Sequence, residues 1–104
     1  MGWGRASHHW QRARKRMPLT RVNERYTRRE DGIYFLLQDG PIEVVCQITV
    51  EALSQLGRTI GLTEATNVFG TARDAIERAA RNKYHRTSRR PHEIVTITSD
   101  DLEP

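Results

Sequence analysis

The feature that most constrains the fold is a turn signal between two runs of strand-forming residues. Residues 33–37 and 42–48 are rich in β-branched and aromatic side chains, and Asp39, Gly40 and Pro41 separate them. Such side chains favour strands, and an Asp-Gly pair between them favours a tight turn, so a β-hairpin is predicted. Alternation along the second strand predicts a core-facing set, namely Ile42, Val44, Cys46 and Ile48.

Two helices are predicted after the hairpin. Thr49 can cap a short helix over residues 50–56 that stops at Gly57, and Thr63 can cap a long helix that runs to about Tyr84. Apolar residues at helical spacing predict the core-facing stripe of the long helix: Ala65, Val68, Phe69, Ala72, Ala75, Ile76, Ala79 and Ala80. The opposite, solvent-facing side is predicted to carry the charges: Arg73, Asp74, Glu77, Arg78 and Arg81.

The rest of the pattern completes a two-layer domain. Residues 93–98 are predicted to form a final strand, and a turn over residues 99–102 returns Leu102 to the core. Gly70, inside the long helix, predicts close approach to the hairpin, and residues 22–26 predict an extra first strand. The fold class is therefore α+β, with hairpin, short helix, long helix and final strand in one small domain over residues 19–104.

A set of positions spread over residues 19–102 gives the chain a second kind of signature. The set comprises Phe35, residues 44–48, residues 50–53, Phe69, Arg73, Ile76, Ala79, Ala80, Tyr84, residues 95–98, Asp101 and Leu102. In order and spacing these positions resemble the small bacterial domain-of-unknown-function family 1488. The resemblance implies a compact α+β domain of strands and two helices, with no established activity, cofactor or catalytic residue. Arg73 and Tyr84 are its polar positions, and both structural hydrogen bonding and a role in a site are open for them.

Charge is distributed unevenly along the chain. Lys and Arg number 17 and Asp and Glu 13, which gives a formal net charge of +4. Residues 1–16 contain no acid and several basic residues, namely Arg5, Arg12, Arg14, Lys15 and Arg16. Residues 1–18 are therefore predicted to be a basic, disordered arm. Met17 is an alternative start that would remove this arm.

A second basic segment, residues 81–92, contains the candidate contacts for anions or nucleic acid. They are Arg81, Lys83, Tyr84, Arg86, Arg89 and Arg90. Arginines beside an aromatic ring can hold phosphates while a base stacks on the ring. The alternative interpretation is structural, because cations at the C-terminal end of a helix offset its dipole.

The second face of the hairpin contains the candidate residues for self-association. If only one face meets the helices, Tyr34, Leu36 and Val45 are left exposed on the other. A homodimer is therefore predicted, formed through this face or through pairing of an exposed strand edge.

Catalytic and cofactor chemistry are not indicated. The chain has one cysteine, Cys46, so it can form no internal disulfide and no CxxC metal site, and a reducing cytosol fits this usage. No phosphate-binding or nucleophile motif is present, and the four histidines lack partners at metal-ligand spacing, so no cofactor and no metal are predicted. No apolar run is long enough to span a membrane.

The sequence thus predicts a cytoplasmic, non-catalytic accessory or regulatory interaction domain with an unknown protein partner or a second copy of itself. The alternative is nucleic-acid binding by the basic arm together with residues 81–92.

Overall fold

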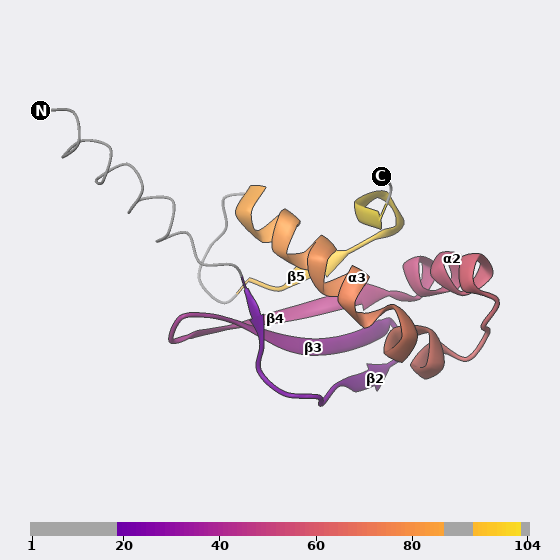
Figure 1. Ribbon diagram of the computed structural model, residues 1–104, viewed down its shortest axis with the longest axis horizontal. Coiled ribbons are helices and arrows are strands. Elements are labelled where there is room, and N and C mark those ends of the chain that lie inside the picture. Colours follow the sequence, from indigo (N-terminus) through magenta and orange to yellow (C-terminus); the bar gives the residue numbers. More distant parts are fainter. Residues whose placement is uncertain (1–18, 87–92, 103–104) are drawn as a thin grey trace, which may run out of the picture.

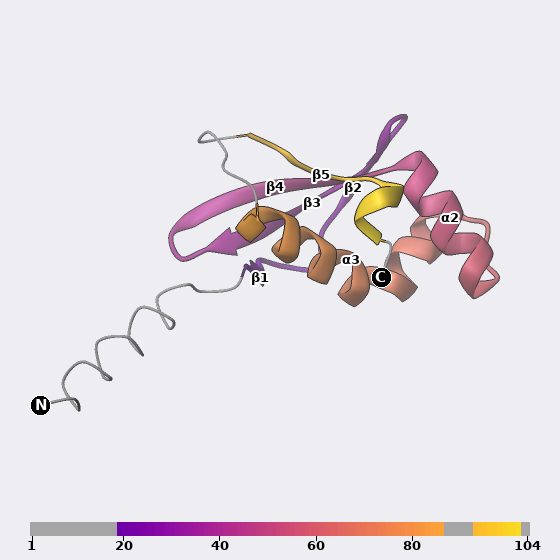
Figure 2. The same ribbon diagram turned by 90° about the horizontal axis from the view of Figure 1, so that it is seen from above.

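The computed structural model describes residues 19–86 and 93–102. Its elements follow in chain order: β1 (Thr20–Arg21), β2 (Thr27–Arg29), β3 (Gly32–Asp39), β4 (Ile42–Thr49), α2 (Val50–Ile60), α3 (Ala65–Arg86), β5 (Val95–Ile97) and the 3₁₀ helix η1 (Ser99–Leu102). Figures 1 and 2 show two layers, with the sheet on one side and α2 and α3 on the other. The α+β prediction is confirmed.

The predicted hairpin is present as β3 and β4. Its antiparallel register runs from Gly32 opposite Thr49 to Asp39 opposite Ile42, so Gly40 and Pro41 alone form the turn. Gly40 has φ 60°, and proline cannot adopt a positive φ. Glycine first and proline second is the arrangement of a type II′ turn, whose twist matches the twist of the strands.

The sheet extends the hairpin on both sides. Its order is β1-β3-β4-β5, and β2 also pairs with β3. β5 lies parallel to β4, with Val95 opposite Cys46 and Ile97 opposite Ile48, so the chain crosses over from β4 to β5 through α2 and α3. The extra strand predicted at residues 22–26 is misplaced, because these residues form the connection between β1 and β2.

The short helix α2 begins as predicted but ends later. The Ala52 amide donates to the Thr49 hydroxyl at 3.2 Å, which caps the helix start. The end is at Ile60, where Gly61 adopts φ 77°, and the prediction that Gly57 stops the helix is wrong. Gly57 has a packing role instead, because a Cβ there would lie 2.4 Å from the Leu62 carbonyl oxygen.

The long helix α3 differs from its predicted pattern at four residues. Arg73 and Glu77 are buried, although the sequence predicts them on the solvent side, and Ala75 is exposed, although it is predicted in the core. Gly70 is exposed, and a Cβ built on it would meet nothing within 4 Å, so the predicted close approach to the hairpin is wrong.

The core lies between the helices and the inner face of the sheet. Buried strand residues from β3 and β4 form its floor: Ile33, Phe35, Leu37, Val44, Cys46 and Ile48. The Phe69 ring of α3 packs on Phe35 and on Tyr26, with centroids 5.3 and 5.1 Å away. Ile42 was predicted in this set but is 58% exposed, because the hairpin tip extends past the end of α3 (Figures 1 and 2).

Candidate functional site

Lys83 of the predicted basic segment joins α3 to the end of the chain. Its ammonium group donates to the Thr96 carbonyl at 2.6 Å and to the Asp101 carboxylate at 2.8 Å. Lys83 is partly buried, and its two acceptors belong to β5 and η1. This residue therefore connects elements of the fold.

Asp101 is the acceptor on which several donors converge. Its Oδ2 atom also accepts from the Thr98 amide at 2.9 Å and from the Thr98 hydroxyl at 3.1 Å, and Arg86 lies 3.5 Å from its other oxygen. Partial burial raises the pKa of the Asp101 carboxyl, but the hydrogen bonds from Lys83 and Thr98 outweigh burial, and the pKa lies below its ordinary value. Asp101 is thus held as a carboxylate.

Tyr84 and Arg81 also contact groups of their own chain. The Tyr84 hydroxyl donates to the Asp39 carboxylate at 2.7 Å, and its ring packs against the core. Arg81 donates to the Leu19 carbonyl at 3.5 Å. Arg89 and Arg90, the remaining members of the predicted set, lie outside the described residues.

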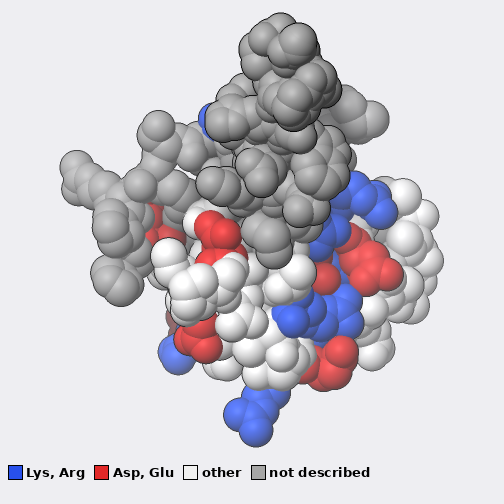
Figure 3. Space-filling model, turned by 60° about the vertical axis from the view of Figure 1, so that its left-hand side comes forward, with Lys and Arg blue, Asp and Glu red and all other residues white. Residues whose placement is uncertain are grey.

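Lys83, Tyr84 and Arg86 of the predicted basic segment thus all contact groups of their own chain. On the face shown in Figure 3, Lys and Arg side chains lie beside Asp and Glu side chains, and the described residues on that face form no continuous basic surface. The described part of the segment is therefore better explained by contacts within the fold.

A buried ionic cluster on α3 was missed by the sequence interpretation. The Glu77 carboxylate accepts from Arg73 at 2.9 Å and from Arg21 of β1 at 2.8 and 3.1 Å. Arg73 also donates to the carbonyls of Glu24 and Asn23, at 2.9 and 3.0 Å. The hydrogen bonds that Arg21 donates to the carboxylates of Glu77 and Glu24 raise the pKa of Arg21 above its ordinary value. The cluster ties the connection between β1 and β2 to α3.

One signal for this cluster was available in the sequence. Arg73 and Glu77 stand four residues apart, a spacing that places them side by side on a helix. The same spacing holds for Asp74 with Arg78, so spacing alone does not say which pair is buried. Arg73 was an open position in the family resemblance, and the structure gives it a structural hydrogen-bonding role.

The outer face of the sheet carries the residues predicted for self-association. Tyr34 and Leu36 are partly exposed and Val45 is 39% exposed, and Leu36 lies directly opposite Val45. Both described helices pack on the other face (Figure 2). Ile94 is 42% exposed and was not predicted as part of this face. The parallel register places Val95 beside Cys46, so Ile94, one residue earlier, lies beside Val45 and extends the row.

Polar groups border this apolar row. In the adjacent row Tyr34 lies opposite Gln47, and the Tyr34 hydroxyl donates to the Asp31 carboxylate at 2.8 Å. That hydrogen bond raises the pKa of Tyr34. The Arg29 guanidinium lies over the Tyr34 ring, 5.9 Å from its centroid. The outer face is thus an apolar strip with polar margins.

The free edge of β5 is partly closed to strand addition. Lys83 occupies the Thr96 carbonyl, and Asp101 occupies the Thr98 amide. A docking strand needs such unpaired backbone groups, and a lysine at the edge is a common means of blocking it. The edge of β5 therefore offers fewer free backbone groups to an added strand.

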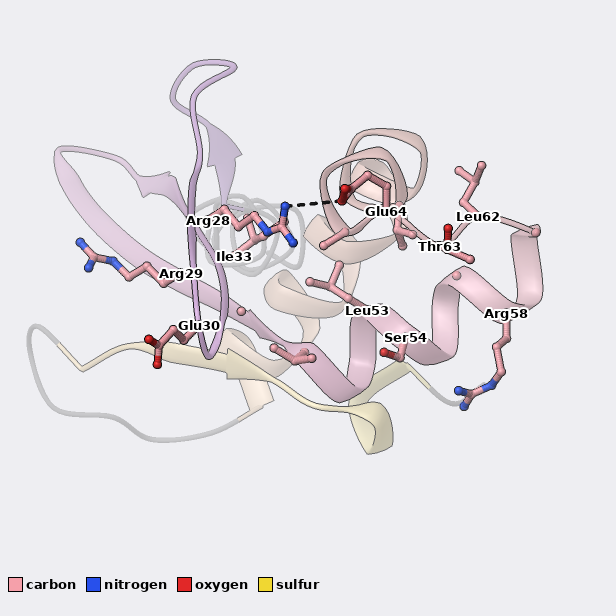
Figure 4. Close-up of a pocket in the computed structure, with 16 residues that line it drawn as sticks. Arg28, Arg29, Glu30, Ile33, Leu53, Ser54, Arg58, Leu62, Thr63 and Glu64 are labelled. Atoms are coloured by element: carbon pink, nitrogen blue, oxygen red, sulfur yellow. Dashed lines mark hydrogen bonds and ion pairs between the residues drawn. The ribbon is translucent and has the colours of Figure 1, made fainter.

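A groove lies between the turn that follows β2, the helix α2 and the start of α3 (Figure 4). Its volume is about 1140 Å³, and none of the predicted site residues lines it. The buried side chains of Ile33, Leu53 and Val68 form its apolar floor. Arg28 and Glu64 meet across it at 3.4 Å and neutralise each other's charge.

The residues in 19–86 and 93–102 contain no group of three or more His, Cys, Asp or Glu side chains arranged to hold a metal ion. None of the helices in the same ranges combines the length and apolar character that crossing a membrane requires.

Comparison with known proteins gives one match. The family model named Protein of unknown function (DUF1488) matches residues 20–97 of the 104-residue chain. No curated protein and no solved structure matches the chain. The resemblance seen in the sequence is confirmed.

Proposed function

The chain belongs to the DUF1488 family of proteins of unknown function, and on that premise we propose that it is a non-catalytic accessory or regulatory domain that acts as a homodimer. The observation that carries the proposal is the apolar row of Leu36, Val45 and Ile94 on a sheet face that the described helices leave uncovered. Exposed apolar rows of this kind are typical of protein interfaces.

The polar chemistry of the fold supports a role without catalysis. The polar side chains that gather in clusters, around Glu77 and around Asp101, are engaged with one another. Every fully buried side-chain nitrogen or oxygen of the described residues has a hydrogen-bond partner. An active site generally keeps such groups available to a substrate.

Nucleic-acid binding by the basic arm and residues 81–92 is the alternative, and it has less support. Lys83, Tyr84 and Arg86 contact groups of the same chain. Binding through phosphates would weaken steeply with added salt, and this salt dependence would identify it.

The proposal is tested by sedimentation equilibrium of the full chain. We expect the wild type to be a dimer at tens of micromolar, and we expect Val45→Asp to be a monomer because it places a charge within the apolar row. Val50→Asp is the matched control: Val50 is 43% exposed, against 39% for Val45, and it is not part of the row of Leu36, Val45 and Ile94. It lies in the first turn of α2, where an acidic residue is favourable.

Two results would count against the proposal. A monomeric wild type at these concentrations would overturn it, and so would equal dimerisation by the Val45→Asp and Val50→Asp variants. Urea unfolding of both variants, measured at low protein concentration, shows whether each keeps the stability of the wild-type monomer.

A further inference from the structure

We infer that the two copies pair face to face with their sheets running in opposite directions, so that Arg29 of each copy lies against the partner's Glu43. This inference rests on the proposed homodimer and concerns its geometry. It follows from the register of the strands and from the position of the charges on the outer face.

The register divides the outer face into rows that cross the strands. Rows are counted here in the direction of β3. The row of Leu36, Val45 and Ile94 then lies one residue after the row of Phe35 and Cys46, and the row of Tyr34 and Gln47 lies one residue before it. Residues directly opposite each other on paired strands share a face. Phe35 and Cys46 themselves point into the core.

A charge stands at each end of this face. Arg29 lies opposite Gly32, which is three residues before Phe35, and Glu43 lies opposite Gln38, which is three residues after it. Arg29 is on β2 and Glu43 is on β4, the strands that flank β3. The midpoint between the two charges therefore falls over Phe35, both along the strands and across them.

This arrangement is self-complementary. Consider a two-fold axis that passes over Phe35, lies between the two sheets and is perpendicular to the line from Arg29 to Glu43. This axis places Arg29 of each copy over Glu43 of the other. The same operation moves the Tyr34 ring to about the level of the partner's Leu36 and Val45. Each aromatic ring then packs on the partner's aliphatic strip, and each charge meets its opposite at the rim.

Neither charge has a competing ion-pair partner on its own face among the described residues. Among the described strand residues that point outward, Arg29 and Glu43 are the charged ones, and neither forms an ion pair within residues 19–86 and 93–102. Asp31, near Arg29, already accepts the Tyr34 hydroxyl. A two-fold axis along the strands would set Arg29 beside the partner's Arg29, and like charges disfavour that geometry.

Charge reversal tests the geometry directly. Arg29→Glu and Glu43→Arg should each raise the dimer dissociation constant about tenfold, because each creates two like-charge contacts in its own dimer. An equimolar mixture of the two variants restores both opposite-charge contacts, so the mixed dimer should form about as tightly as the wild type. Arg58→Glu, an exposed reversal on α2, is the control and should leave the dissociation constant unchanged.

The outcomes separate the two proposals. A wild-type dimer that Val45→Asp dissociates, but that shows no recovery when the charge variants are mixed, would overturn the antiparallel geometry and leave the interface standing. A monomeric wild type would overturn both. Sedimentation equilibrium of each variant and of the mixture, at low ionic strength, gives the required dissociation constants.

Discussion

The inner and outer surfaces of the sheet are built from alternate residues of the same strands, yet they use polar groups differently. Between the layers, Arg73, Glu77 and Lys83 each bridge elements that are far apart in the sequence. On the outer face, Arg29 and Glu43 stand at the margins without an ion partner among the described residues. The difference indicates that inner polar groups join the layers through ion pairs, whereas the fold does not use the outer charges Arg29 and Glu43 in this way.

The largest expected effect tests the inner cluster. Glu77→Gln should lower the free energy of unfolding by about 3 kcal/mol or more, because it removes the buried carboxylate that accepts hydrogen bonds from both Arg73 and Arg21. Asp74→Asn on the same helix is the control, because the Asp74 side chain is 89% exposed, and it should cost less than about 0.5 kcal/mol. Equal losses in urea unfolding would contradict the larger contribution assigned to the buried carboxylate.

The next effect contrasts two glycines on the helices. Gly57→Ala should cost about 1–3 kcal/mol, because its Cβ would meet the Leu62 carbonyl at 2.4 Å and Val68 at 3.2 Å. Gly70→Ala should stabilise the protein by about 0.5–1 kcal/mol, since an exposed helical glycine costs backbone entropy and its Cβ meets nothing within 4 Å. Thermal unfolding of both variants measures this contrast, and changes of the same sign would break it.

The smallest effect concerns Asp101 and its pH dependence. Asp101→Asn should cost about 1 kcal/mol at pH 7, because it removes the charge that pairs with Lys83. The folded-state pKa of Asp101 is lowered, so its stabilising contribution is present above the unfolded-state pKa and is lost as pH falls through the folded-state value. The stability difference between wild type and variant should therefore shrink below about pH 4. A difference that stays constant from pH 7 to pH 2 would refute this assignment.

Local chemistry explains which parts of the fold were predictable. The Asp39-Gly40-Pro41 turn and the Thr49 cap act within a few residues, and the hairpin and the start of α2 appear where predicted. The predicted end of α2 was wrong because the sequence offers two glycines, Gly57 and Gly61, that can each stop a helix. The choice between them depends on Leu62 and Val68, which pack on Gly57 from outside α2.

The candidate site divides in the same way. Tyr34, Leu36 and Val45 followed from alternation along two adjacent strands, and they lie on one face. Ile94 joins them only through the parallel register of β5, which no local pattern encodes. Arg73 was misassigned because its acceptors include the carbonyls of Asn23 and Glu24, on a segment that its own helix does not specify.

The parallel pairing of β5 with β4 also has a consequence for the order of folding. β3 and β4 meet through a two-residue turn, whereas Val95 reaches Cys46 only after the whole of α2 and α3 has been placed between them. Closing so long a loop carries an entropic cost that the hairpin avoids. β5 is thus expected to join the sheet last, with the Lys83 and Asp101 contacts forming as it docks.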